Sequence, residues 1–249
     1  MLAVFQRSVA EGPQELTSPH KQAEMKKNGV EVMESFGSAN SGVVCVKFGS
    51  AGAMAYTHKN QPLLTPRSFA VVGDIFCMFE GALENMALLK QQYGLNKSSN
   101  EVTIVIEAYR SLRDRGPYPA DQVVRDLVGK FAFVLFDSKS HTIFAAADSD
   151  GSVPLFWGTA ADGCLVMSDD VAILKGGCGK CFAPFPRGCF FSTSGGLQNF
   201  EHPMNKLTPL PHVDSEGQMC GANFKVDEFS KKRARMPRVG SEANWANNF

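Results

Sequence analysis

The segment Phe131-Ala132-Phe133-Val134-Leu135-Phe136-Asp137 decides the fold, together with Thr142-Ile143-Phe144-Ala145-Ala146-Ala147-Asp148, which follows a polar turn. Both segments are almost entirely apolar, whereas a hairpin with one face in water alternates apolar and polar residues. Strands that are apolar on both faces need another layer on each side. The sequence therefore predicts a central β-hairpin that is covered by packed layers of strands and helices.

The segments on either side of this hairpin predict further strands and helices around it. Short apolar runs predict strands at residues 2–5, 43–48, 53–56, 69–79, 154–157, 164–167 and 188–192. Helical patterns lie at residues 84–93, 98–115 and 119–127, with a weaker one at residues 21–36 inside a long polar connection. These elements predict an α/β sandwich of several layers, with sheets packed on each other and helices outside.

The two helices before the hairpin carry recognisable end signals. Gly94 directly follows the first helix and is typical of the residue just past a helix C-terminus. Ser98 lies three residues before Glu101, which predicts a capping box at the start of the second helix. Apolar side chains in this second helix repeat at helical spacing and predict one buried stripe: Val102, Val105, Ile106, Tyr109 and Leu112.

The composition excludes several classes of protein and partner. The chain has 249 residues, of which 44% are hydrophobic, so it can bury a core and is neither disordered nor collagen-like. Its 25 basic residues balance 25 acidic ones, so no overall field attracts nucleic acid or an anionic membrane. No stretch approaches the ~18 apolar residues of a membrane span, and the first residues lack the basic region of a signal peptide. We therefore expect a cytoplasmic protein without membrane insertion or nucleic-acid binding.

Seven scattered cysteines predict reduced thiols rather than a disulfide framework. Cys178 and Cys181 form a C-x-x-C pair, but no second pair or histidine motif completes a set of four zinc ligands. Packing is the favoured interpretation of this pair, and we predict no metal and no cofactor. The acidic residues at predicted turns are likewise assigned to turn geometry: Asp148, Asp150, Asp169 and Asp170.

The central hairpin and the turn after it carry a recognisable signature. Gly129–Val134, Asp137 and Asp148–Phe156 together resemble the G-x-F-A-F strand and the R-D-x-x-G-x-x-P-L-F turn of class II glutamine amidotransferases, such as the glutaminase domain of asparagine synthetase. The segments Glu80–Asn85 and Pro186–Gly188 are similar to two further segments of that family. The resemblance implies an α+β fold, a four-layer αββα sandwich of the N-terminal-nucleophile hydrolase type.

A second resemblance is closer. Tyr93-Gly94-Leu95 and Leu112-Arg113-Asp114-Arg115 are similar to the motifs of the plant aluminium-induced proteins with YGL and LRDR motifs, a group that includes stem-specific and auxin-repressed proteins. The start MLAVF and the segment MPRVGSEANW fit the same group, so the resemblance runs from Met1 to Trp245. These are stress- and sugar-responsive proteins, and the resemblance brings no established reaction with it.

The resemblance to the amidotransferases implies that their chemistry is lost here. In those enzymes the second encoded residue is a cysteine, which becomes the N-terminal nucleophile and uses its own α-amine as the base. Leu2 occupies this position and supplies no nucleophile. A bulky second residue is also expected to block removal of Met1, so the terminal amine is displaced by one residue. We predict no catalytic residue, and Leu2 marks the vestigial nucleophile position.

Five residues make up the predicted remnant of the ligand pocket: Glu80, Gly81, Asn85, Ser99 and Glu101. Glu80 stands where the family has an oxyanion-stabilising asparagine, and an ionised carboxylate would repel a developing oxyanion. Ser99 stands where the family has the acidic residue that binds the substrate α-amine. Gly81 can be retained for its backbone geometry alone. Arg67 is near enough to be the carboxylate-binding arginine, but the sequence does not align it.

Three readings of the function follow. The leading one is a non-catalytic protein that acts by sensing a small metabolite or by associating with a protein, and a homodimer is expected. The alternative is a hydrolase or transferase with a remodelled pocket and Glu80 as base, and a third is a structural role through oligomers. The basic helix end at residues 110–115 is a solvated face or a docking patch for an acidic partner.

Two further predictions concern the boundaries of the domain and the location of the protein in the cell. Residues 1–227 are predicted to form the amidotransferase-like domain and residues 228–249 a polar, basic tail. The run Lys231-Lys232-Arg233-Ala234-Arg235 in this tail predicts a nuclear fraction beside the cytoplasmic one, although a solvated tail explains it equally well.

Overall fold

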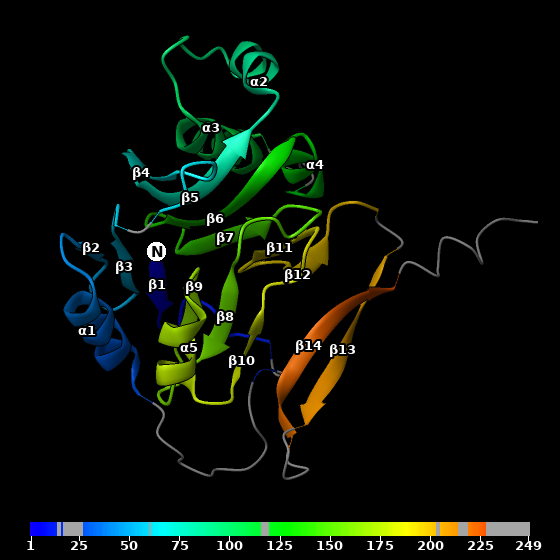
Figure 1. Ribbon diagram of the computed structural model, residues 1–249. Helices are drawn as coiled ribbons and strands as arrows, with labels where there is room; N and C mark the ends of the chain where they lie inside the picture. Colours follow the sequence, from blue (N-terminus) through cyan, green and yellow to red (C-terminus); the bar gives the residue numbers. More distant parts are fainter. Residues whose placement is uncertain are drawn as a thin grey trace, which may run out of the picture.

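The computed structural model describes residues 1–13, 16, 27–59, 61–115, 120–202, 205–213 and 219–227. Two six-stranded antiparallel sheets pack face to face, and helices cover the outer side of each sheet (Figure 1). The several-layered sandwich predicted from the residue pattern, and the four-layer αββα form that the resemblance implies, are therefore confirmed. The predicted tail and its basic run lie outside the described residues.

The first sheet has the strand order β10-β8-β9-β1-β3-β2. Its strands are β1 (Leu2–Phe5), β2 (Val44–Lys47), β3 (Gly52–Tyr56), β8 (Phe156–Thr159), β9 (Leu165–Ser168) and β10 (Phe182–Pro184). Helices α1 (Gly29–Ala39) and α5 (Val171–Cys178) cover its outer face. The N-terminal strand β1 thus lies inside this sheet, between β9 and β3.

The second sheet has the strand order β12-β11-β7-β6-β5-β4. Its strands are β4 (Arg67–Val72), β5 (Ile75–Leu83), β6 (Gly129–Asp137), β7 (Thr142–Ala147), β11 (Cys189–Ser192) and β12 (Gly196–Asn199). Helices α2 (Met86–Gln92), α3 (Glu101–Asp114) and α4 (Ala120–Arg125) cover its outer face. The remaining strands, β13 (Lys206–Val213) and β14 (Met219–Asp227), form a separate hairpin beside the sandwich.

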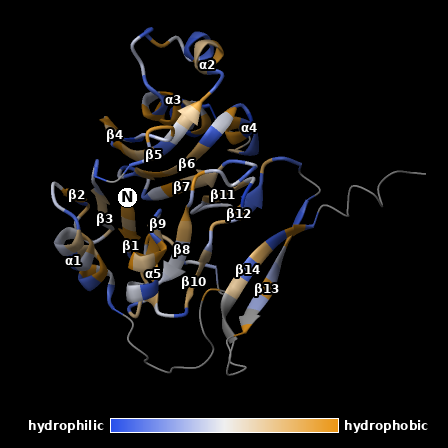
Figure 2. Ribbon diagram, in the orientation of Figure 1, coloured by the Kyte–Doolittle hydropathy of each residue, from blue (hydrophilic) through white to orange (hydrophobic). Residues whose placement is uncertain are grey.

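The central hairpin β6–β7 confirms the argument from its unbroken apolar sequence. Alternate residues of β6 enter two different cores: Phe133 packs toward the helices, whereas Val134 packs between the sheets. Both faces of the strand are therefore buried, as uninterrupted apolar sequence requires. Figure 2 shows the same pattern in β1, whose four residues are all hydrophobic.

Two predicted helix starts are wrong. Helix α1 begins at Gly29, not at residue 21, because Asn28 forms a capping box with Glu31 there. Residues 21–26 lie outside the described part of the chain. Helix α3 begins at Glu101 and is capped by Asn100, whose side chain accepts from the Thr103 N–H, so the predicted Ser98 capping box does not form.

The sequence predicted the bounds of some other elements only approximately and did not predict several elements at all. Strand β8 begins two residues later than predicted, because Pro154 cannot contribute an N–H to a ladder. Helix α5 and strands β10 and β12–β14 were not anticipated. Cys178 ends α5, and both it and Cys181 are buried. Among the described residues, no helix is long and apolar enough to cross a membrane.

Candidate functional site

The N-terminus of the chain lies at the buried end of β1. Register pairing places Leu2 opposite Ser168, so Met1 lies next to Asp169, which follows β9. The α-ammonium of Met1 donates to Asp169 Oδ1 at 2.5 Å. The Ser168 hydroxyl donates to the Met1 carbonyl oxygen at 2.8 Å. The first sheet therefore holds the terminal amine at a fixed position beside a carboxylate.

The second sheet supplies the partners of this pair. Arg67 and Glu80 lie opposite each other on β4 and β5, and Arg67 Nε donates to Glu80 Oε2 at 3.0 Å. The other end of the guanidinium forms an ion pair with Asp169 Oδ2 through Nη2. We call these four groups the ion cluster: the Met1 α-ammonium, Arg67, Glu80 and Asp169. It joins the two sheets and contains two positive and two negative groups.

The arginine of the ion cluster is held from several directions. Its Nη1 donates to the Lys59 carbonyl at 3.2 Å, and its backbone N–H donates to Gln61 Oε1 at 3.1 Å. The Tyr56 hydroxyl donates to the Arg67 carbonyl at 2.7 Å and also contacts His58. Only 13% of the Arg67 side chain is exposed. The guanidinium thus forms its hydrogen bonds and ion pairs with groups of the protein itself.

Burial dominates the electrostatics of the ion cluster. It lowers the pKa of the Met1 α-ammonium below its ordinary 8.0, although Asp169 opposes this shift. Burial also raises the pKa of Glu80 above its ordinary 4.5, while the hydrogen bond from Arg67 opposes the change. All four groups are largely buried, and the Glu80 side chain is only 1% exposed. Each charge is therefore stabilised by its partners in the cluster rather than by water.

Leu2 does not face the ion cluster. Its side chain is fully buried in the apolar cluster that includes Val32 and Leu174, under α1 and α5. Met1 instead belongs to the core between the sheets. The position that the resemblance assigns to a nucleophile is therefore a hydrophobic anchor of β1.

The other thiols and hydroxyls near β1 are poorly suited to attack a substrate. Burial raises the pKa values of Cys164 and Cys189 to about 12, which keeps both as thiols near neutral pH. Cys45 is exposed, but it lies on the edge strand β2. The Ser168 hydroxyl is already engaged by Met1 and by the Asp170 N–H, which donates to it at 3.1 Å.

The predicted pocket residues do not converge on one point. Glu80 belongs to the ion cluster, whereas Asn85 donates to the Asp126 carbonyl at 2.8 Å and accepts from the Val128 N–H. Asn85 therefore fixes the connection from α4 to β6. Within the described chain, no hydrogen bond or ion pair links Ser99 or Glu101, at the start of α3, to Glu80.

Gly81 follows Glu80 and has a backbone requirement of its own. Its φ angle is 133°, and its N–H donates to the Pro66 carbonyl at 3.1 Å. A Cβ at this position would lie 2.0 Å from the Lys130 carbonyl oxygen of the neighbouring strand. Close approach of β5 and β6 thus accounts for this glycine without any ligand.

Sequence reasoning did not assign Asp169 or the terminal amine to the site, and it left Arg67 unaligned. The sequence assigns Asp169 to a turn, because aspartate favours turns for its local geometry. Only strand register brings it to Met1, and only the packing of the two sheets brings it to Arg67. The one available signal was an arginine two residues before the strand predicted at residues 69–79.

The YGL and LRDR segments have structural partners. In the first, Gly94 has a φ of 64°, and the Leu95 N–H donates to the Lys90 carbonyl at 2.8 Å, which ends α2. In the second, Arg113 Nη1 donates at 3.1 Å to Asp137, a fully buried residue at the end of β6. The first segment therefore ends α2, and the second fastens α3 to the second sheet.

Comparison with known proteins identifies the family. The family model described as "Aluminium induced protein" matches residues 2–226. The chain belongs to this family. One relative is the stem-specific protein TSJT1 of Nicotiana tabacum. It is 45% identical over 148 residues, which cover 59% of this chain and 99% of that protein.

The chain is also similar to glutamine-hydrolysing asparagine synthetases. It is 41% identical over 73 residues to a probable enzyme of Dictyostelium discoideum and 25% identical over 126 residues to asparagine synthetase B of Escherichia coli. These matches cover 29% and 49% of this chain, but only 13% and 21% of the two synthetases. A solved glutamine phosphoribosylpyrophosphate amidotransferase from B. subtilis aligns with 82% of this chain and 50% of its own, at 17% identity and a TM-score of 0.48.

Proposed function

We propose that this protein is a non-catalytic relative of the glutamine amidotransferase domain, which acts by associating with a protein or by sensing a small metabolite. Residues 1–227 would form that domain, and residues 228–249 a basic tail. The ion cluster carries the proposal. Arg67, which is suited to bind a substrate carboxylate, is paired with Glu80 and Asp169. The terminal amine, which could act as a base only when deprotonated, is held as an ammonium by Asp169.

Amide hydrolysis through a covalent intermediate needs a nucleophile, a base within reach and donors for the oxyanion. Leu2 supplies no nucleophile and packs under α1 and α5. The amine that would serve as base donates instead to Asp169. Glu80 presents acceptor oxygens where donors are needed. Loss of a single oxyanion donor costs a factor of about 10²–10³ in rate, so the combined losses are incompatible with turnover.

A remodelled hydrolase with Glu80 as its base is the alternative. The raised pKa of Glu80 favours this role, since a base with a pKa nearer neutrality is more effective. The hydrogen bond from Arg67 and the 1% exposure of the Glu80 side chain oppose it. A substrate would have to displace Arg67 before it could reach the carboxylate.

The test is ammonia release from glutamine by the purified full-length protein, with intact mass used to identify its first residue. We expect no release above a heat-killed control. Release that disappears in Glu80→Gln would overturn the proposal and favour the remodelled hydrolase. Thermal shift against a metabolite panel would then separate sensing from association, because a ligand at 100 times its Kd stabilises by about 2.7 kcal/mol.

Association is proposed to include a homodimer. A domain that is fused to a synthetase in its relatives must cover or replace the surface that faced the missing part. Leu63 and Leu64, which are 98% and 87% exposed in the connection before β4, are apolar groups that such contact would cover. Light scattering at micromolar concentration is the test, and a monomeric mass would exclude the dimer.

A further inference from the structure

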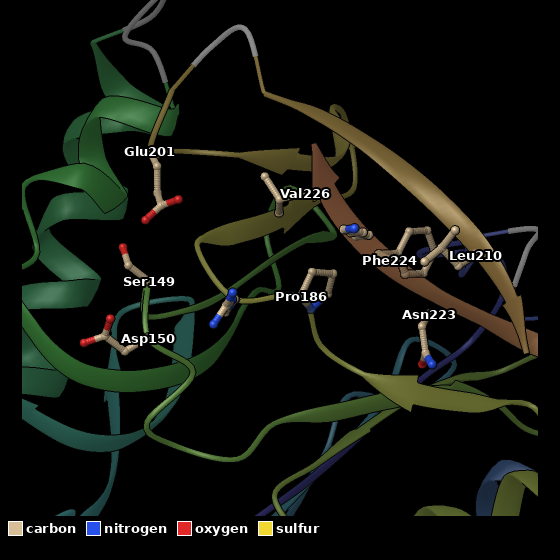
Figure 3. A pocket seen from close by; sticks show the side chains of 10 residues that line it. Ser149, Asp150, Pro186, Glu201, Leu210, Asn223, Phe224 and Val226 are labelled. Atoms are coloured by element: carbon tan, nitrogen blue, oxygen red, sulfur yellow. The ribbon is translucent and has the colours of Figure 1, made fainter. Parts of the chain in front are cut away.

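A trench separates the β13–β14 hairpin from the edge of the sandwich. Figure 3 shows its main cavity, of about 620 Å³, with Ser149, Asp150 and Glu201 at one end and Asn223 and Phe224 on β14 at the other. A second cavity of about 480 Å³ adjoins it, since both are lined by Asp150, Pro186, Arg187, Asn223 and Phe224. We call the two cavities together the hairpin trench.

One wall of the hairpin trench is the edge of β14 itself. Four consecutive residues of this strand, 223–226, line the main cavity. Pro209 and Pro211 of β13 lie opposite Phe224 and Ala222, and proline cannot donate to a ladder. These pairs are therefore the non-hydrogen-bonded ones, and the backbone groups of Phe224 and Val226 point away from β13.

This outward edge of β14 has no strand partner in the described chain. Strand β14 lies beside β10, yet no backbone hydrogen bond joins them, because β10 pairs only with β8. The hairpin is held instead by side chains, including the contact of Phe224 with Trp157 at a centroid distance of 5.6 Å. An unpaired strand edge that lines a cavity is a template for an additional strand.

The charged side chains of the hairpin trench are also unpaired. Asp150, Arg187, Glu201 and Lys225 are exposed, and none of them forms an ion pair within the described residues. A Cβ on Gly188 would lie 3.0 Å from Glu201 Cδ, so this carboxylate lies beside the loop that carries Arg187. Two positive and two negative groups therefore line one cavity without neutralising each other.

We propose that the hairpin trench binds an extended peptide segment of a partner protein, which adds to β14 as a third strand. Its backbone pairs with Phe224 and Val226, which supplies affinity independent of sequence. An acidic side chain of the peptide faces Arg187 and Lys225, and a basic one faces Asp150 and Glu201. This inference rests on the proposed role in association and names the class of partner.

The experiment uses the full-length protein and an array of fluorescent decapeptides with blocked ends. The host peptide alternates threonine and valine, and one glutamate and one lysine are moved through its positions. We expect fluorescence polarisation to detect binding for peptides with one spacing of the two charges. N-methylation of alternate residues of the best peptide removes backbone donors and should weaken binding by at least about tenfold.

Charge reversal tests the orientation of the peptide. Arg187→Glu should weaken the best peptide by about fivefold, and exchange of the peptide's glutamate for lysine should restore binding. Arg115→Glu, at the exposed end of α3, is the matched control and should leave binding unchanged.

Three outcomes would overturn the proposal: no peptide binds, N-methylation has no effect, or Arg187→Glu and Arg115→Glu weaken binding equally. Competition by free glutamate or lysine at the peptide's own concentration would identify a small-molecule site instead and also overturn it. The glutamine assay does not enter this experiment. Failure of every peptide to bind would therefore not contradict the proposed loss of catalysis. Ammonia release from glutamine would not contradict the proposed peptide binding.

Discussion

Arg67 on β4 forms ion pairs with Glu80 in its own sheet and with Asp169 in the other. Asp169 in turn accepts from the α-ammonium of Met1. One guanidinium thus connects the two sheets at the end of the strand that begins the chain. A buried charge whose partner is removed costs several kcal/mol, so this contact makes the N-terminal strand sensitive to single substitutions.

Asp169→Asn should destabilise the protein by about 3–5 kcal/mol, because it leaves Arg67 and the Met1 α-ammonium short of a counter-ion. The neighbouring Asp170→Asn is the control. Asp170 caps α5 by accepting from the Ala172 N–H, and asparagine caps a helix equally well. The measurement is the free energy of unfolding in urea. Equal losses in the two variants would show that the ion cluster contributes no special stability.

Arg113→Ala should destabilise the fold by about 1.5–3 kcal/mol at neutral pH, because it removes a charged hydrogen bond to the buried Asp137. Arg115→Ala, at the exposed end of the same helix, should change the free energy of unfolding by less than about 0.5 kcal/mol. Similar losses in the two variants would favour a solvated basic face over a specific clamp.

The same pair predicts a pH dependence. Burial alone would raise the pKa of Asp137, but hydrogen bonds from Arg113 and from the Ser140 and Lys139 backbones hold it below the ordinary 3.8. A depressed carboxyl pKa contributes stability above pH 3.8, and this contribution is lost as the pH falls through the folded-state value. The difference between wild type and Arg113→Ala should therefore shrink below about pH 4. A difference that stays constant down to pH 2 would contradict this.

Gly81→Ala should destabilise the protein by at least about 3 kcal/mol, since its φ of 133° is strained for alanine and the new methyl would meet the Lys130 carbonyl. Gly37 in α1 has nothing within 4 Å of an added Cβ, so Gly37→Ala should stabilise by about 0.5–1 kcal/mol. Thermal unfolding of both variants is the measurement, and a tolerated alanine at position 81 would refute the backbone explanation.

Leu2→Cys should permit removal of Met1 without creating glutaminase activity. Arg67 is still paired with Glu80 and Asp169, and Glu80 presents a carboxylate where the resemblance places an oxyanion donor. Intact mass reports the processing, and ammonia release from glutamine reports turnover. Turnover in this variant would show that the nucleophile alone had been lost.

Replacement of Lys231, Lys232, Arg233 and Arg235 by alanine should lower the nuclear fraction of a fluorescent fusion below that of a size-matched control. An unchanged distribution would leave the basic run as a solvated tail.

The sequence by itself determined the layered fold. The uninterrupted apolar strands β6 and β7 require cover on both faces, and the apolar stripe of α3 supplies part of it. These signals are local, because the spacing of apolar residues along one segment shows which faces of a strand or helix are buried. Helix starts were less certain, since Ser98 and Asn100 both offer a capping side chain and geometry selected Asn100.

Only the tertiary structure decided the site. Glu80 was predicted from its segment, but its partner Arg67 lies across a strand pair, and Asp169 lies in the other sheet. Likewise, only the register of β13 with β14 shows that Pro209 and Pro211 lie at non-hydrogen-bonded pairs. The other edge of β14 is therefore open and lies beside unpaired charges. Contacts between residues distant in the chain depend on register and sheet packing, and one sequence read along its length records neither.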